Sequence, residues 1–219
     1  MQTQALLFDL DGTLADTALD LGGALNDLLH QKGLPEKSLT DIRPYAAHGS
    51  AALLQFGANI TPQMPEFDAW QQHYLALYGA RSTRDTVLFP DVNTVLLALQ
   101  KHNIRWGIVT NKHARFTDVL VPKLGFVVPP DVVVSGDTCP QAKPSPEPLL
   151  YACEQLNVLP EHCWYVGDAQ RDIQAGKNAG MKTILAAWGY ITQHEQPETW
   201  QSDYLAHNMN DLLSLLSLI

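Results

Sequence analysis

The chain has little of what zinc-binding and disulfide-rich secreted proteins are built from. Its 219 residues include three cysteines, Cys139, Cys153 and Cys163, which form no Cys-x-x-Cys pair and cannot all pair with one another. This cysteine usage favours a reducing compartment. The eight histidines show neither the His-x-His nor the His-Glu-x-x-His spacing, which argues against a zinc site built from them.

Basic residues are also scarce and scattered, with 14 Lys and Arg against 23 Asp and Glu and a net charge of -9. Because no basic stripe is available to meet a phosphate backbone, we expect no nucleic acid partner. No apolar run approaches the roughly 20 residues of a membrane-spanning helix. Residues 1–4 show no basic region of a secretory signal. We therefore expect a cytoplasmic protein without a membrane partner.

Apolar residues are abundant, at 46%, so the chain can bury a sizeable core. Beyond residue 86 they form segments that alternate between strand and helix patterns. Such alternation is typical of an α/β protein with a doubly wound parallel sheet. Strands are predicted at 5–8, 105–109, 132–134, 163–166 and 183–185, and helices at 92–101, 114–124, 146–156, 172–179 and from about 210.

The region between the first strand and residue 86 shows only helical patterns. Helices are predicted at 18–29 behind the cap Asp16-Thr17, after the capping box that begins at Ser38, at 51–56, and from Thr61 onward. The last of these carries an aromatic face, which we interpret as packing, and the polar stretch 81–85 is interpreted as a linker. We predict a core of residues 1–14 and 86–219 with an inserted all-helical cap domain at 15–85.

The first strand runs directly into Asp9-Leu10-Asp11-Gly12-Thr13. Since side chains alternate along a strand, Asp9 and Asp11 can point the same way from its carboxyl end. Two carboxylates that close together repel unless a cation or a shared proton compensates. The alternative is a strand that simply ends in an Asp-Gly turn.

Polar residues also follow the other predicted strands. Thr110-Asn111 ends the second strand, Gly167-Asp168 follows a later one with Asp172 four residues on, and Lys143 lies between them in sequence. Taken singly, these residues have ordinary roles as helix caps or solvated charges. Because the carboxyl ends of parallel strands meet at one edge of a sheet, we expect them to converge there.

These four motifs, in this order, strongly resemble those of the haloacid dehalogenase superfamily of phosphotransferases. The resemblance covers nearly the whole chain and implies a Rossmann-like core. The helical insertion resembles the cap of the phosphoglycolate phosphatase-like branch. One departure is Asp91 in Phe89-Pro90-Asp91-Val92, where that branch usually has Pro-Gly. Since Asp can cap the helix that follows, we infer no loss of activity from it.

The resemblance implies a Mg²⁺-dependent phosphatase that acts through an aspartyl-phosphate. Asp9 would be the nucleophile, and Asp11 would protonate the departing alkoxide and later deprotonate the attacking water. Asp9, the backbone carbonyl of Asp11 and Asp168 would hold Mg²⁺. Asp172 would act at the metal through water or by orienting Lys143.

The remaining motif residues are implied to handle the phosphoryl group. Thr110 would donate to a phosphoryl oxygen, with help from Asn111 and the following helix N-terminus. Lys143 would neutralise charge on the nucleophile and on the transferring group. Gly12 is also predicted to contact the substrate.

Asp11 favours phosphoryl transfer over dehalogenation, since a departing halide needs no acid. A sugar phosphomutase and a non-enzymatic phosphate-ligand sensor remain alternatives. Residues 42–50 resemble a subset of the branch that acts on N-acetylmuramic acid 6-phosphate, so phosphoglycolate and this sugar phosphate both stay open. Arg43 and His48 are predicted to contact the substrate, Arg43 through a carboxylate. We expect a small phosphomonoester as the partner of a monomer or homodimer.

Overall fold

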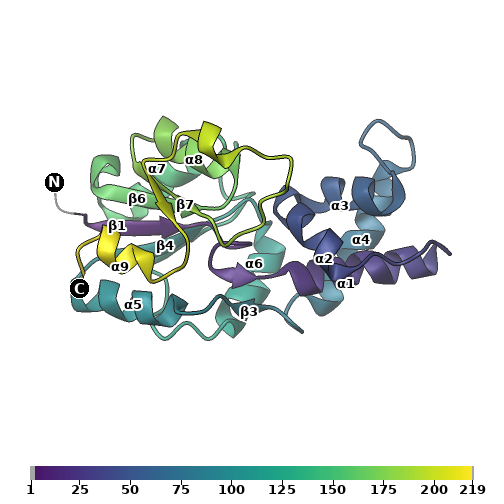
Figure 1. Cartoon of the computed structure of the whole chain (residues 1–219), viewed down its shortest axis with the longest axis horizontal. Helices are drawn as coiled ribbons and strands as arrows, with labels where there is room; N and C mark the ends of the chain where they lie inside the picture. Colours follow the sequence, from purple (N-terminus) through teal and green to yellow (C-terminus); the bar gives the residue numbers. More distant parts are fainter. Residues whose placement is uncertain (1–2, 219) are drawn as a thin grey trace.

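Six parallel strands form one sheet in the computed structural model of the protein, which describes residues 3–218. Their order across the sheet is β5-β4-β1-β6-β7-β8, so the first strand lies inside the sheet (Figure 1). The strands are β1 (Ala5–Phe8), β4 (Arg105–Val109), β5 (Val132–Val134), β6 (Cys163–Gly167), β7 (Lys182–Ala186) and β8 (Tyr204–Ala206). The predicted doubly wound α/β fold is confirmed.

Helices cover both faces of this sheet, and the side chains of β1 alternate between them. Leu6 and Phe8 belong to the hydrophobic core beneath α5 (Val92–Lys101) and α9 (Asp211–Leu215). Ala5 and Leu7 pack on the opposite side, against α7 (Glu147–Leu156) and α8 (Gln170–Asn178). Figure 1 shows the two pairs above and below the sheet. A strand buried on both faces needs a continuous apolar run, as β1 has.

The helical region forms a second lobe, which we call the cap, at one end of the sheet (Figure 1). Its own hydrophobic cluster includes Leu25, Leu28 and Leu54. Two short antiparallel strands, β2 and β3, lie where the chain leaves and re-enters the core. The elements are β2 (Ala15–Asp16), α1 (Ala18–Gln31), α2 (Leu39–Ile42), the 3-10 helix η1 (Arg43–His48), α3 (Gly49–Ala58), α4 (Phe67–Arg81) and β3 (Val87–Leu88).

Two helix starts differ from expectation. The predicted start of α4 at Thr61 is wrong, because Pro65 has no N–H to bond back to the Thr61 carbonyl, and the helix begins at Phe67. The predicted capping role of Asp91 is also wrong. Asp91 precedes α5 with φ of 65° and makes no capping hydrogen bond. Glycine adopts that left-handed conformation without strain, which explains a Pro-Gly pattern at this point.

The interpretation of 81–85 as a linker is wrong at its first residue. Arg81 ends α4, and its guanidinium lies 3.6 Å from the fully buried carboxylate of Asp20 and 2.8 Å from Asp27. The sequence pattern also missed β2, β3 and β8. Strands of two or three residues show no alternation, and β5 was found because its three residues are all β-branched. After β4 the chain continues through α6 (Ala114–Leu120) and η2 (Val121–Lys123), and later through η3 (Pro160–His162) and η4 (Pro197–Trp200).

None of the helices in residues 3–218 combines the length and hydrophobicity that crossing a lipid bilayer requires.

Candidate active site

In three neighbouring strands, the first polar residue after the carboxyl end of the strand lies at the same place on the edge of the sheet. In the register of the sheet, Phe8 of β1 lies opposite Ile108 of β4 and Val166 of β6. Asp9, which follows β1, is therefore close to the residues that end β4 and β6. Because parallel strands end on the same side of a sheet, the fold converts separate motifs into one cluster.

Three buried carboxylates form the centre of that cluster. Asp9, Asp168 and Asp172 offer oxygen atoms that all lie within 4.8 Å of one another. Burial, together with the nearby Asp9 and Asp172, raises the pKa of Asp168 to about 7. A set of buried oxygen ligands with unbalanced negative charge fits a hard divalent cation such as Mg²⁺. The carboxylate of Asp11, by contrast, lies outside this group.

Lys143 supplies the positive charge inside the cluster. Its Nζ lies 2.9 Å from Asp9 Oδ1 and 2.8 Å from Asp172 Oδ1, and it also donates to the carbonyl of Val109 and to the hydroxyl of Tyr165. Burial raises the pKa of Asp9, but Lys143, the charge of Arg171 and the Leu10 N–H together outweigh it and lower the pKa below its usual value. Asp9 is therefore held ionised, as a nucleophile needs to be.

Asn111 holds the loop that carries Lys143. Its side-chain amide donates to the Lys143 carbonyl at 2.9 Å, and its side-chain oxygen accepts from the Lys143 N–H at 3.0 Å. The side chain borders the cavity described below, but these two bonds occupy both its polar atoms. Its structural role is thus to position Lys143. Thr110 is buried, borders the same cavity, and accepts a hydrogen bond from the Lys112 N–H.

Gly12 is required by packing. Its φ is 83°, and a Cβ at this position would collide with the carboxylate of Asp168. The structure places it beside the carboxylate cluster rather than on the cavity wall. Thr13 Oγ1 donates to the same Asp168 at 3.0 Å, so the turn after β1 holds this carboxylate in place.

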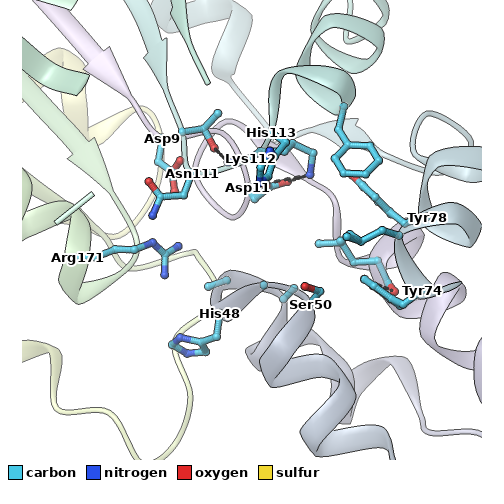
Figure 2. Close-up of a pocket in the computed structure, with 17 residues that line it drawn as sticks. Asp9, Asp11, His48, Ser50, Tyr74, Tyr78, Asn111, Lys112, His113 and Arg171 are labelled. Carbon is cyan, nitrogen blue, oxygen red and sulfur yellow. Dashed lines mark hydrogen bonds and ion pairs between the residues drawn. The ribbon is translucent and has the colours of Figure 1, made fainter. Parts of the chain in front are cut away.

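A cavity of about 340 Å³ lies between the core and the cap, next to the cluster (Figure 2). Both lobes contribute to its wall. The core supplies polar residues, among them Asp9, Asp11, Thr110 and Lys112, and the cap supplies the start of α3 and an apolar and aromatic wall that includes Leu21, Tyr74 and Tyr78. The aromatic face of α4 therefore packs as predicted, and it also borders the site.

Two basic residues of the wall were not found by the sequence analysis. Lys112 Nζ donates to both oxygens of Asp11, at 2.9 and 3.1 Å, and lies 4.7 Å from the ring centre of Tyr78. Burial lowers the pKa of Lys112, but Asp11 and Tyr78 together outweigh it and raise the pKa above its usual value. No sequence signal separates Lys112 from an ordinary surface lysine.

Arg171 is the second. It lies in the first turn of α8, one residue before Asp172, and its guanidinium extends into the cavity (Figure 2). Its Nε atom is buried without a hydrogen-bond partner. A positive charge in the first turn of a helix opposes the helix dipole. An arginine at this unfavourable position in a predicted helix is the signal by which the sequence could have indicated a functional role for Arg171.

The two cap residues predicted to contact substrate lie in different settings. Both oxygens of Asp16 accept from Arg43 Nη1 at 2.9 Å, and the Arg43 guanidinium lies over the ring of Tyr190. Arg43 is not part of the cavity wall, whereas His48 is. The ring of His48 points away from Asp9 in Figure 2, and its Nε2 lies 3.5 Å from Glu195.

Known proteins are similar to this chain over most of its length. Residues 6–186 match the family model described as haloacid dehalogenase-like hydrolase. A phosphoglycolate phosphatase from Xanthomonas campestris is 38% identical over 92% of this chain and 91% of its own length. An N-acetylmuramic acid 6-phosphate phosphatase from Pseudomonas aeruginosa is 32% identical over 99% of this chain and 96% of its own.

The fold has a solved counterpart. The crystal structure of a predicted phosphoglycolate phosphatase from Haemophilus somnus superposes with a TM-score of 0.82, at 25% identity, over 98% of each chain. The likeness includes the cap as well as the core, since coverage is nearly complete.

Proposed function

Since this chain belongs to the haloacid dehalogenase-like hydrolase family, we propose that it is a Mg²⁺-dependent phosphomonoester phosphatase that acts through an aspartyl-phosphate. Its relatives bear the names of phosphoric monoester hydrolases. The observation that carries the proposal is the buried group of Asp9, Asp168 and Asp172, with Lys143 between two of its members.

Asp9 is the nucleophile in this proposal. An oxygen of its ionised carboxylate attacks the phosphorus, and the bond to the leaving alkoxide breaks, which leaves the phosphoryl group on Asp9. Lys143 offsets negative charge on both the attacking carboxylate and the transferring group. Thr110, at the end of β4, is available to donate its hydroxyl to a phosphoryl oxygen.

Asp11 is the acid and base. It borders the cavity, on the side where a leaving group would lie, and it is separate from the carboxylate cluster. In its protonated form it donates a proton to the departing alkoxide, and the carboxylate that results then accepts a proton from the water that hydrolyses the aspartyl-phosphate. Lys112 holds its carboxylate at the cavity wall through two hydrogen bonds.

Asp9 and Asp168, together with the main-chain carbonyl of Asp11, are the proposed Mg²⁺ ligands. Asp172 supports the site, through water or through its contact with Lys143. When bound, the cation offsets the repulsion between a phosphate dianion and the carboxylates. These residues fit a cation because they offer buried oxygen donors and because the raised pKa of Asp168 marks uncompensated negative charge.

Small phosphomonoesters that carry a carboxylate are the proposed substrates, with phosphoglycolate first, as the name of the Xanthomonas relative suggests. N-acetylmuramic acid 6-phosphate is the second candidate. The cavity of about 340 Å³, with Tyr74 and Tyr78 in its wall, has room and aromatic surface for a sugar ring. Phosphoglycolate, whose acid has only two carbons, needs neither this room nor an aromatic surface.

A panel assay tests the proposal. Phosphate release is measured for phosphoglycolate, N-acetylmuramic acid 6-phosphate and hexose phosphates, each with Mg²⁺ and with a chelator. We expect metal-dependent release without added sugar bisphosphate, since a requirement for a bisphosphate would indicate a phosphomutase instead. No release from any of these compounds would contradict the proposed function and favour a phosphate-ligand sensor.

A further inference from the structure

Arg171 is the cation at the cavity for which residues 3–218 provide no ion-pair partner. Lys143 is paired with Asp9 and Asp172, and Lys112 is paired with Asp11. Arg171 is half-buried, and within the same residues its buried Nε has no hydrogen-bond partner, while its side chain borders the cavity. A buried N–H without an acceptor is costly, because it has lost water and gained no partner.

We propose that Arg171 binds the carboxylate of the substrate and thereby sets a preference for phosphomonoesters that carry one. This inference rests on the proposed function, because it assigns a residue to the carboxylate of the substrate, which is remote from the phosphorus. A guanidinium presents parallel N–H donors that match the two oxygens of a carboxylate.

Arg171 keeps its charge in this setting. A guanidinium stays protonated in proteins, and the carboxylates of Asp172, Asp9 and Asp168 lie near it. These carboxylates attract the guanidinium without bonding to it. Its donors therefore remain available on the cavity side.

The opposite wall presents further donors. In Figure 2 the Arg171 side chain extends across the cavity toward the start of α3, where Gly49 and Ser50 border it. The residue before this helix, His48, makes no side-chain cap, so the first N–H groups of α3 lack an acceptor from it. The positive end of the helix and Arg171 thus face each other, which favours an anion between them.

Binding of the phosphoryl group is not needed to explain the donors of Arg171 and of the α3 N-terminus. It is already provided for by Lys143, Thr110 and the proposed cation at the carboxylate cluster. A second anionic group on the same substrate accounts for Arg171, and a carboxylate is the group that both candidate substrates share.

Two pairs of substrates test this carboxylate, because one member of each pair carries it and the other does not. The first pair is phosphoglycolate and 2-hydroxyethyl phosphate, in which a hydroxymethyl group replaces the carboxylate. The second pair is N-acetylmuramic acid 6-phosphate and N-acetylglucosamine 6-phosphate, which lacks the lactyl carboxylate. Steady-state kcat and KM are measured with whichever pair the unchanged protein hydrolyses.

The variant is Arg171→Met, which keeps the length of the side chain and removes its charge. We expect kcat/KM for the carboxylate-bearing substrate to fall about 10-fold or more, mainly through KM, and kcat/KM for the partner substrate without a carboxylate to fall less than about 3-fold. Arg171→Lys should recover part of the loss. Arg43→Ala tests the competing arginine, which the sequence predicts to bind the carboxylate. Because Arg43 is paired with Asp16 outside the cavity wall, this variant should change the ratio of the two kcat/KM values by less than about 3-fold.

Other outcomes overturn the inference. An equal fall for both members of a pair means that Arg171 binds the phosphoryl group. Arg171 does not bind a substrate carboxylate if Arg171→Met leaves the ratio of the two kcat/KM values unchanged. The same conclusion follows if only Arg43→Ala lowers this ratio, or if the unchanged protein uses both substrates equally well. None of these results affects the proposed phosphatase activity, which fails only if the unchanged protein releases no phosphate.

Discussion

Lys112 Nζ donates hydrogen bonds to both carboxylate oxygens of Asp11, at 2.9 and 3.1 Å. The bond joins the turn after β1 to the loop after β4. It also separates the two aspartates of the first motif by function, because Asp9 contacts Lys143 and belongs to the carboxylate cluster while Asp11 does not. This separation agrees with the proposed roles of Asp9 in attack and of Asp11 in proton transfer.

This ion pair predicts a catalytic effect of Lys112. In Lys112→Met, Asp11 loses the donors that hold it at the cavity wall, and kcat should fall about 10-fold with a smaller change in KM. Steady-state kinetics on a hydrolysed phosphomonoester measures this effect. Lys101→Met, which alters an exposed lysine on α5, is the control and should keep kcat. An unaltered kcat in Lys112→Met would show that the pair does not position Asp11.

Removal of the nucleophile should abolish turnover. In Asp9→Asn the carboxylate that attacks phosphorus is replaced by an amide of the same shape, and kcat should fall by at least about 10³-fold if covalent catalysis carries the rate. Phosphate release is measured together with the circular dichroism spectrum, which should be retained. Substantial turnover in the folded variant would rule out Asp9 as the nucleophile.

Mg²⁺ should stabilise the protein more at alkaline than at acidic pH. The folded-state pKa of Asp168, about 7, lies above the ordinary value of 3.8, so the folded protein binds this proton more tightly than the unfolded chain. The stability contributed by Asp168 is therefore full below about pH 4 and is lost as pH rises through about 7. Excess Mg²⁺ binds the ionised form and compensates for that loss.

The direction of this pH dependence is tested by melting temperatures measured with chelator and with Mg²⁺ at about pH 5.5 and about pH 8. The rise caused by Mg²⁺ should be larger at the higher pH. Asp168→Asn is the control, in which the rise should disappear while the metal-free protein gains stability from the removed charge. Equal rises at both pH values, or a rise that survives in the variant, would contradict the placement of the cation at Asp168.

The Asn111 amide should matter more for catalysis than for stability. Asn111→Ala removes two hydrogen bonds to the Lys143 backbone, which together contribute about 1–3 kcal/mol to the free energy of unfolding. Because Lys143 is then held less firmly, kcat should fall about 10-fold or more. Urea unfolding and steady-state kinetics measure the two effects.

The cap contains a matched control for this variant. Asn26 makes the same reciprocal pair of bonds with the backbone of Lys37, both at 2.9 Å, remote from the cluster. Asn26→Ala should lose a similar free energy of unfolding and keep its kcat. If both variants lose kcat equally, the effect of Asn111 is general destabilisation rather than positioning.

The sequence by itself determined the sheet and the meeting point of its motifs. Ala5 to Phe8 is too short and too apolar for anything but a buried strand, and the alternation beyond residue 86 requires parallel strands. Polar residues at the carboxyl ends of such strands converge by topology, so Asp9, Thr110 and Asp168 could be grouped before any side chain was placed. The resemblance to a known family then supplied their roles.

Only the tertiary structure decided where the long basic side chains point. Arg43 pairs with Asp16, Lys112 with Asp11, and Arg171 extends into the cavity without a partner. The charge of such a side chain is visible in the sequence, but its direction depends on which acceptors distant segments bring within reach. Asp16 lies 27 residues from Arg43, and Asp11 lies 101 residues from Lys112, so no local pattern encodes either pairing.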